Sequence, residues 1–207
     1  KRPCDMPAHR RRRQKLPSVA ITGSAGKTTT KDLSAHVLGR RLRVRKSEGN
    51  LNTYTGIPMT IFRMSPGDRA LVVEYGMSWA GEIAELASIA PPNVGVVLNV
   101  GLAHVGFLGS IEGVAAAKRE LVEGLAPGGL AVLNADDPPV RATTALSRRS
   151  TLFGLSPQHA VPAGKLTSHR LDGLHSHPPT PASTAAAPLR TPPQHRCPPP
   201  PRAPPSP

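Results

Sequence analysis

The chain has 207 residues, of which 38% are hydrophobic, and its formal net charge is +13. A length of this order indicates one main domain with appendages. The charge lies mainly at the two ends, because residues 18–155 carry fourteen Lys or Arg against eleven acids. No apolar run approaches the roughly 20 residues that a membrane helix needs, and no apolar segment follows the N-terminal arginines, so we expect neither a membrane span nor a secretory signal.

The first segment, residues 1–16, is a basic lead-in that contains four consecutive arginines at 10–13. Such a run is typical of a solvated, disordered segment, and the alternative is an arm that binds nucleic acid or an anionic surface. We expect no nucleic-acid partner. The two cysteines, Cys4 and Cys197, lie at opposite ends and have no zinc-type spacing, which favours a reducing, cytoplasmic compartment.

A glycine-rich segment at residues 23–29 lies between a predicted strand at 18–22 and a predicted helix at 31–38. This order is the one that a phosphate-binding loop requires. Gly23 and Gly26 allow backbone N–H groups to face an anion, and the N-terminus of the helix points to the same place. Lys27 would contact the β- and γ-phosphates, and Thr28 would supply a hydroxyl for Mg²⁺. Only two residues separate the glycines, which disfavours a generic P-loop NTPase, and a glycine-rich turn with a chance Lys-Thr is the alternative.

Short apolar strands and helical patterns alternate along the rest of the middle region. The predicted strands are 43–47, 70–75, 94–100, 130–134 and 150–154, and the predicted helices are 57–64, 81–90, 110–125 and 135–147, with a loop at 101–109. Continuous apolar strands in this order indicate an α/β fold with a mostly parallel sheet and helices on both faces. Ligands bind beyond the carboxyl ends of such strands. The phosphate loop, Glu74, His104 and Asn134 are all expected there.

Three of the polar residues are ambiguous when each is taken alone. Glu74 ends a buried strand, where a carboxylate is costly unless it is paired or metal-bound. An acid at this place can share Mg²⁺ with Thr28, and a structural ion pair is the alternative. His104 could be a surface residue of its loop or a metal ligand. Lys118 alone would be read as a solvated lysine of its helix.

Several short motifs together resemble the Mur ligase family, and the short glycine-loop spacing is shared with the related folylpolyglutamate synthases. The matching segments occur in family order: 22–29, 48–52, 56–58, 74–77, 81–83, 99–104, 116–120 and 134–138. They cover about residues 17–155. The segments 48–52 and 81–83 are most similar to the branch of the family that adds D-alanyl-D-alanine to UDP-N-acetylmuramoyl-tripeptide.

The resemblance implies a P-loop type central ATP-binding domain at residues 17–177, followed by a Pro-rich disordered tail at 178–207. It implies a cytoplasmic, monomeric, ATP-dependent amide ligase of peptidoglycan precursor synthesis that works through an acyl phosphate. The cofactors would be ATP and Mg²⁺, and the partners would be UDP-N-acetylmuramoyl-tripeptide and D-alanyl-D-alanine.

The resemblance also assigns residues to roles. The catalytic residues would be Lys27, Glu74, His104 and Lys118. ATP would be bound by Gly23, Ser24, Ala25, Gly26, Lys27, Thr28 and Thr29. Thr28 and Glu74 would hold one Mg²⁺, and His104 with a carbamylated Lys118 would support a second. Asn50, Asn52 and Thr53 match the loop that meets the nucleotide-sugar peptide.

The chain departs from the family pattern at both ends. Family members carry an N-terminal domain that binds the UDP part and a C-terminal domain that closes over ATP, whereas this sequence has a short basic segment and a Pro-rich tail in those places. We therefore expect an incomplete chain with weak or no activity of its own. The alternatives are another Mur ligase, an amide ligase like folylpolyglutamate synthase, or a non-catalytic nucleotide-binding remnant whose basic flanks bind polyanions.

Overall fold

The structure, a computed structural model, describes residues 16–156, 161–162, 165–169 and 173–177. The chain divides into two compact units, residues 1–162 and 163–207. The predicted lead-in, apart from Leu16, and the predicted tail at 178–207 lie outside the described residues. The predicted domain boundaries therefore stay predictions.

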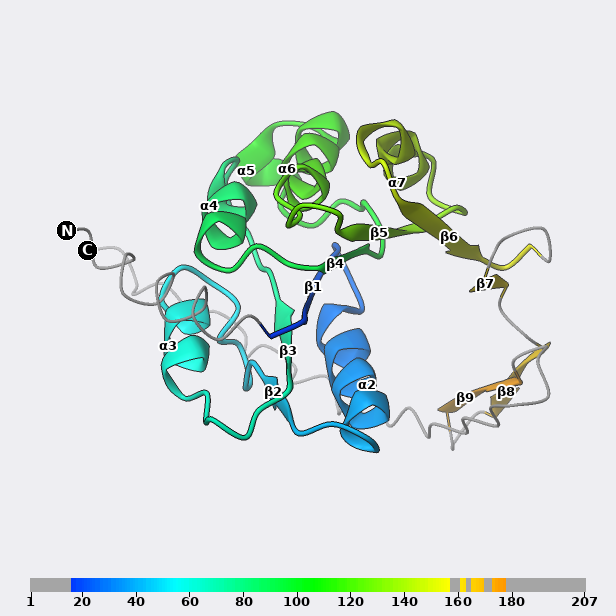
Figure 1. The fold of residues 1–207 in the computed structure, drawn as a ribbon. Coiled ribbons are helices and arrows are strands. Elements are labelled where there is room, and N and C mark those ends of the chain that lie inside the picture. The colour runs from blue at the N-terminus through cyan, green and yellow to red at the C-terminus, as the bar shows by residue number, and fades with distance from the viewer. Residues whose placement is uncertain (1–15, 157–160, 163–164, 170–172, 178–207) are drawn as a thin grey trace, which may run out of the picture. The chain divides into compact units, whose positions relative to one another are not determined.

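The first unit contains a seven-stranded sheet in which every described pairing is parallel. In chain order the strands are β1 (Ser18–Thr22), β2 (Val44–Lys46), β3 (Ala70–Glu74), β4 (Val94–Val97), β5 (Leu130–Asn134), β6 (Ser150–Gly154) and β7 (Val161–Pro162). Their order across the sheet is β2-β3-β1-β4-β5-β6-β7. Strand β1 thus lies between β3 and β4 (Figure 1). The predicted parallel α/β fold is confirmed.

Helices cover both faces of this sheet. They are α2 (Lys27–Gly39), α3 (Gly56–Phe62), α4 (Glu82–Ile89), α5 (Val105–Leu108), α6 (Ile111–Glu123) and α7 (Pro138–Ala142), with a 3₁₀ turn, η1 (Thr143–Leu146), after the last. Figure 1 shows α2 on the side of the sheet opposite to α4 and α6. The two faces are therefore unequal, because one described helix covers one of them and several cover the other.

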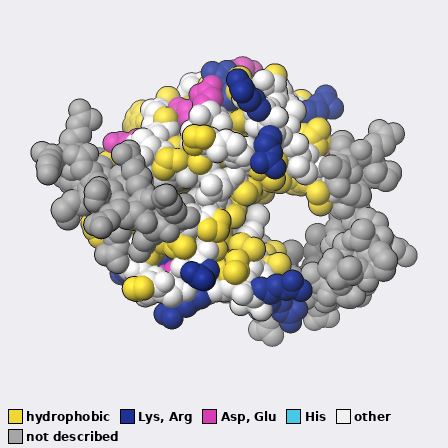
Figure 2. Space-filling model, viewed as in Figure 1, with side chains coloured by type: hydrophobic (Ala, Val, Ile, Leu, Met, Phe, Trp, Pro, Cys, Tyr) yellow, Lys and Arg dark blue, Asp and Glu magenta, His cyan; other side chains and the backbone are white. Residues whose placement is uncertain are grey.

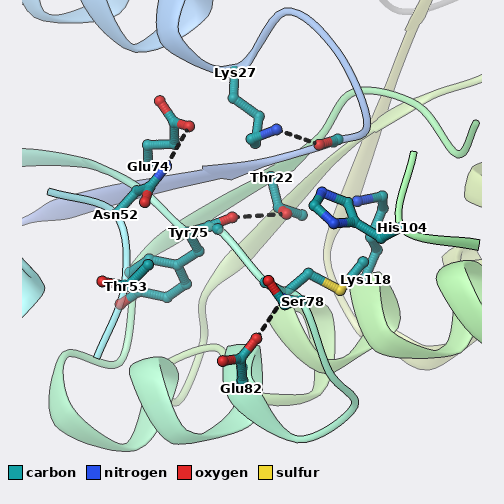
Figure 3. A pocket seen from close by; sticks show the side chains of 13 residues that line it. Thr22, Lys27, Asn52, Thr53, Glu74, Tyr75, Ser78, Glu82, His104 and Lys118 are labelled. Carbon is teal, nitrogen blue, oxygen red and sulfur yellow. Dashed lines mark hydrogen bonds between the residues drawn. The ribbon is translucent and has the colours of Figure 1, made fainter. Parts of the chain in front are cut away.

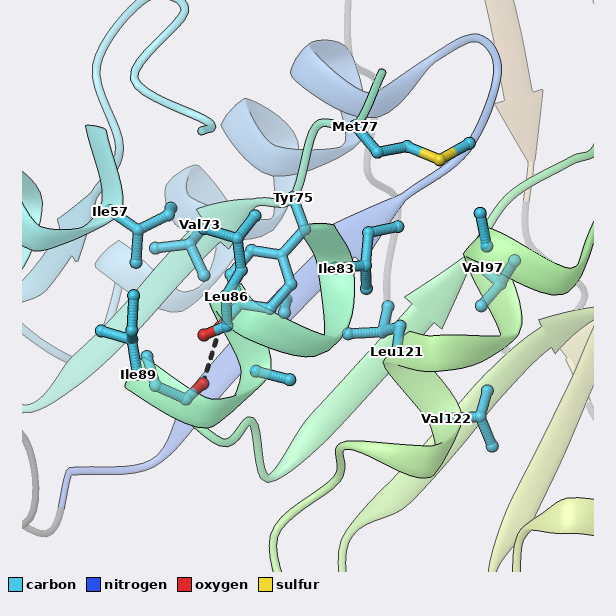
Figure 4. Close-up of a cluster of buried hydrophobic side chains, with 14 of the residues drawn as sticks. Ile57, Val73, Tyr75, Met77, Ile83, Leu86, Ile89, Val97, Leu121 and Val122 are labelled. Atoms are coloured by element: carbon cyan, nitrogen blue, oxygen red, sulfur yellow. Dashed lines mark hydrogen bonds between the residues drawn. The ribbon is translucent and has the colours of Figure 1, made fainter. Parts of the chain in front are cut away.

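The hydrophobic core follows the two-residue period of the strands. Ile21 and Val72 face α2 and pack with Ala35, whereas Ala20 and Val73 face the larger cluster on the other side. Figure 4 shows the helical part of that larger cluster around β3 and β4. Its helical members include Ile57, Ile61, Ile83, Leu86, Val114, Leu121 and Val140. Burial of these apolar stripes fixes where each helix lies, and so fixes the loops that leave the strands.

Element boundaries differ from the sequence predictions at several places. The loop predicted at 101–109 contains the short helix α5, which begins after His104 at φ 72°. The predicted helix at 135–147 divides into α7 and η1, and Asp137 caps α7 by accepting a hydrogen bond from the Val140 N–H at 3.1 Å. The predicted cap Ser110 is confirmed, since its hydroxyl accepts from the Gly113 N–H at 3.1 Å.

The sequence analysis placed the last strand at 150–154, and this was wrong. Strand β7 follows in the first unit, and the second unit contains an antiparallel pair, β8 (Lys165–His169) and β9 (Gly173–His177). These strands were missed because their sequences lack the continuous apolar run that marked the others.

The described surface has two further properties that bear on function. None of the described helices is both long and apolar enough to cross a bilayer. On the face shown in Figure 2, Lys and Arg side chains stand in separate groups, and acidic side chains lie beside those at the top. This face therefore offers no continuous basic surface.

Candidate functional site

The glycine-rich segment forms the turn between β1 and α2. Gly26 adopts φ 79°, the left-handed conformation that favours glycine, and is the N-cap residue of α2. A Cβ on Gly23 would lie 2.9 Å from the Cβ of Leu98, so the turn closely approaches the residue that follows β4. Within the part of the chain that the structure describes, no side chain caps α2. Its N-terminal N–H groups therefore suit an anion.

Asn99 anchors this loop from the segment after β4. The Ser24 N–H donates to the Asn99 carbonyl at 3.1 Å, and the Ala25 N–H donates to Asn99 Oδ1 at 2.9 Å. The Asn99 amide returns a hydrogen bond to the Ala25 carbonyl at 3.2 Å, and the Gly101 N–H donates to Ser24 Oγ at 2.8 Å. The backbone N–H groups of Ser24 and Ala25, two of the residues that we expected to bind ATP, thus donate to Asn99 instead. Asn99 belonged to a recognised motif but received no role from the sequence.

Thr28 and Glu74 meet at the carboxyl end of β3. The Thr28 hydroxyl donates to Glu74 Oε2 at 2.8 Å, and the Asn52 side-chain amide donates to Glu74 Oε1 at 2.9 Å. Glu74 is 3% exposed, so these bonds offset the cost of burying its carboxylate. Nearby, Lys27 Nζ donates to the Gly23 carbonyl at 2.8 Å, which keeps the lysine folded over its own loop.

His104 and Lys118 lie together on the far side of the loop from Glu74 (Figure 3). Lys118 is 1% exposed, so the reading of it as a solvated lysine is wrong. Burial, with a smaller contribution from the charge of Lys27, lowers the pKa of Lys118 to about 8. Burial also lowers the pKa of His104, and the charges of Lys118 and Lys27 lower it further against an opposing effect of Glu82.

These groups surround one cavity of ≈ 320 Å³ at the carboxyl ends of β1, β3 and β4 (Figure 3). Its lining consists of Thr22, Gly23, Lys27, Asn52, Thr53, Glu74, Tyr75, Gly76, Met77, Ser78, Glu82, His104 and Lys118. Seven of the residues proposed from the sequence are therefore brought together. The others, Ser24, Ala25, Gly26, Thr28, Thr29 and Asn50, lie outside this lining.

The Thr28 hydroxyl, beside the cavity, and the Glu74 carboxylate, in its lining, suit Mg²⁺. A hydroxyl and a carboxylate held 2.8 Å apart are hard donors of the kind that Mg²⁺ prefers, and the buried position of Glu74 would strengthen their hold on a cation. Among the described residues there is no cluster of three or more His, Cys, Asp or Glu side chains that could bind a metal. A cation here would therefore depend on ligands from phosphate or water, which is the usual arrangement for Mg²⁺.

Ser78 and Glu82 line the cavity, although the sequence analysis gave neither a role. Glu82 Oε2 accepts hydrogen bonds from the N–H groups of Ser78 and Trp79, the latter at 2.9 Å. The signal for this was available, because a glutamate that directly follows Gly81 and opens a helix is typical of an N-terminal cap region.

A family model described as "Mur ligase middle domain" matches residues 21–187. The chain belongs to the Mur ligase family. The match begins at residue 21 and extends past residue 155, where the motifs end, and it includes every residue of the cavity lining.

Two relatives share a high degree of similarity with the chain. The UDP-N-acetylmuramoyl-tripeptide–D-alanyl-D-alanine ligase of Synechocystis sp. is 44% identical over 127 residues, which are 61% of this chain and 28% of that protein. The structure of MurF ligase from Thermotoga maritima in complex with ADP is 32% identical, with a TM-score of 0.77, over 84% of this chain and 40% of the other. The chain thus spans 28% of the first relative's length.

A more distant likeness bears on the fold alone. FPGS from L. casei covers 84% of this chain with a TM-score of 0.58, at 16% sequence identity. The short glycine-loop spacing that we noted in both groups is therefore accompanied by a shared architecture.

Proposed function

We propose that this chain supplies the ATP-binding part of an amide ligase that joins D-alanyl-D-alanine to UDP-N-acetylmuramoyl-tripeptide. The proposal rests chiefly on one observation, the convergence of Lys27, Glu74, His104 and Lys118 on a single cavity beside the phosphate loop. The substrates are those in the name of the Synechocystis relative, and ADP is bound by the related MurF of T. maritima.

In the proposed reaction the terminal carboxylate of the tripeptide attacks the γ-phosphorus of ATP, and ADP leaves. The amine of D-alanyl-D-alanine then attacks the acyl phosphate, loses a proton and expels phosphate, so that an amide, ADP and phosphate result. Little of this chemistry needs a covalent contribution from the protein, so positioning and charge stabilisation would dominate catalysis.

Lys27 would exchange its bond to the Gly23 carbonyl for bonds to the β- and γ-phosphates. This change costs little, because Lys27 Nζ keeps an oxygen partner throughout, and charge-assisted bonds to phosphate are the stronger ones. The N-terminus of α2 and residues 23–29 would hold the rest of the phosphate chain.

Thr28 and Glu74 would hold Mg²⁺ at the point where their oxygen atoms already meet. When bound, the ion would neutralise charge on the β- and γ-phosphates. Asn52 would keep Glu74 oriented through its bond to Oε1. Asn50 and Thr53 are exposed on the same loop and would contact the nucleotide-sugar peptide, with Thr53 at the cavity itself.

His104 and Lys118 would support a second Mg²⁺. A pKa of about 8 leaves a sizeable neutral fraction of the Lys118 amine near neutral pH, and the neutral amine is the form that adds CO₂, with loss of a proton, to give a carbamate. Carbamylation would replace a buried cation by an anion with two oxygen donors, which suits a site that receives metal ions. From the family resemblance we also propose a cytoplasmic monomer whose ATP-binding domain spans residues 17–177.

Calorimetric titration with Mg-ATP tests the proposal. Lys27→Ala should weaken binding roughly 10- to 100-fold, because a charge-assisted hydrogen bond contributes about 1.5–3 kcal/mol. Lys46→Ala is the matched control, since Lys46 pairs with Asp32 at 2.7 Å on the outside of the protein, and its affinity should match the unmodified chain. Equal affinity in all three proteins, or no binding in any, would refute the proposal.

An amide ligase with another acceptor or donor, such as a folylpolyglutamate synthase-like enzyme, is the second candidate. The likeness of fold to FPGS from L. casei favours it only at the level of architecture. Binding of UDP-N-acetylmuramoyl-tripeptide, measured in the same calorimeter against a folate polyglutamate, separates the two.

A further inference from the structure

The start of helix α4 is capped by a side chain from another helix. Gly81, the N-cap residue at φ 91°, has no capping side chain of its own within the described chain. Glu120 of α6 takes that place, because Oε1 accepts from the Gly81 N–H at 2.7 Å and Oε2 accepts from the Ala84 N–H at 3.0 Å. Both carboxylate oxygens are used, and the negative charge lies at the positive end of the α4 dipole.

A second carboxylate extends this connection to the cavity. Glu82, the first residue of α4, accepts hydrogen bonds from the N–H groups of Ser78 and Trp79. Ser78 and Glu82 line the cavity together with His104 and Lys118, and Figure 3 shows Ser78 beside Lys118. Glu120 therefore holds the start of α4, and from there Glu82 holds the segment that forms one wall of the cavity.

Helix α6 carries both the cavity residue Lys118 and the capping residue Glu120. Lys118 enters the cavity from α6, and Glu120 follows it by two residues on that helix. At the other end of the helix pair, a Cβ on Gly124 would overlap the Cβ of Ala87, so α4 and α6 are in close contact there. The pair is thus fixed at two points, by packing at Gly124 and by hydrogen bonds at Glu120.

We propose that Glu120 is a positioning residue that sets the cavity wall at residues 78–82 against Lys118. Its catalytic consequence rests on the function proposed above, whereas the positioning itself does not. The proposal makes a specific claim about transmission: loss of Glu120 should loosen Ser78 and Trp79, although Glu120 contacts neither of their N–H groups.

Amide hydrogen exchange of the 207-residue chain, resolved by NMR, tests this claim. In Glu120→Ala the amides of Gly81 and Ala84 should exchange at least about 10-fold faster, and those of Ser78 and Trp79 should accelerate as well. Glu120→Gln keeps one acceptor oxygen and should fall between the alanine variant and the unmodified chain. Trp79 is the single tryptophan, so its fluorescence anisotropy should fall in the same order.

Glu123→Ala is the matched control, because it removes a carboxylate from the same helix, and among the described residues that carboxylate pairs with the exposed Arg119 at 3.0 Å. It should leave all four amides protected. Unchanged exchange at Ser78 and Trp79 in Glu120→Ala would overturn the proposal and reduce Glu120 to a cap of α4. If Glu120→Ala fails to fold, equal protection of these amides in Glu120→Gln and the unmodified chain would overturn it.

Mg-ATP titration of the same samples keeps the two proposals apart. Absence of ATP binding in the unmodified chain would count against the proposed function, while the exchange pattern would still decide the role of Glu120.

Discussion

At the scale of single residues, the site contains a buried lysine, Lys118, and burial disfavours the charged form of its amine. Lys118 is almost wholly inside the protein, and its pKa falls from an ordinary 10.5 to about 8. Well below pH 8 the amine is mainly protonated in both the folded and the unfolded chain, and the folded state bears the cost of burying the charge. Between pH 8 and 10.5 the unfolded chain binds more protons, so stability from this group rises with pH.

Replacing this lysine should therefore stabilise the protein while damaging its proposed function. Lys118→Met keeps the length of the side chain but removes the charge, and at pH 7 the gain should approach about 3 kcal/mol, the equivalent of a shift of this size. The gain should shrink as the pH rises from 8 to 10.5. Urea denaturation in CO₂-free buffers at several pH values measures it.

The exposed Lys46 provides the control for this series. Lys46→Met should change the free energy of unfolding by less than about 0.5 kcal/mol at every pH, since its ion pair with Asp32 lies at the surface. A Lys118→Met variant whose stability relative to the unmodified chain is independent of pH would contradict the assignment.

At the scale of elements, the packing of α4 against α6 depends on a missing side chain. Gly124→Ala should destabilise the protein by about 1–3 kcal/mol, because the new methyl group overlaps Ala87 and forces the helices apart. Ala87→Gly in the same chain should restore part of the loss, and Gly39→Ala, at a site with open space, should be neutral or slightly stabilising. Thermal unfolding of the unmodified chain, the three single variants and the Gly124→Ala/Ala87→Gly double variant checks this, and additive effects of the two neighbouring changes would contradict it.

The order of strands and helices could be predicted from sequence, whereas details of the elements could not. Apolar runs such as 70–74 and 130–134 are continuous, so they identify buried parallel strands directly. Helix α5 was not predicted because a one-turn helix leaves no periodic pattern. The buried state of Lys118 was also inaccessible, since a lysine within Ala-Ala-Ala-Lys-Arg-Glu is typical of a solvent-facing helix and only tertiary packing of α6 buries it.

The candidate site likewise has features that the sequence predicts and features that it does not. Lys27, Glu74 and His104 follow strand ends, and the parallel topology alone brings them to one edge of the sheet. The contacts of Asn99 with the loop and of Glu120 with α4 depend on side-chain directions between segments 36 to 74 residues apart, which no local pattern encodes. These residues were recognised only as parts of motifs, without a physical role.

At the scale of the whole molecule, the first unit should fold and bind nucleotide by itself. Both core clusters and every residue of the cavity lining lie within residues 16–162. In this unit the structure describes residues 16–156 and 161–162. Residues 16–162 produced alone should therefore bind Mg-ATP with an affinity within about 3-fold of that of the 207-residue chain. A difference of 3-fold corresponds to less than about 1 kcal/mol. An insoluble or unfolded product would contradict this, and circular dichroism provides the check.

The central position of β1 has a consequence for how the protein is made. Its two neighbours in the sheet are β3 and β4, whose residues are synthesised about 50 and 75 positions later, whereas β2 pairs with β3. The strand that leads into the phosphate loop therefore leaves the ribosome before either of its partners, and it has no sheet partner until Glu74 has emerged. Parallel pairing over such separations is intrinsically slow. Nucleotide can thus stabilise the fold only after β3 and β4 have been made, and until then the apolar β1 is exposed to aggregation.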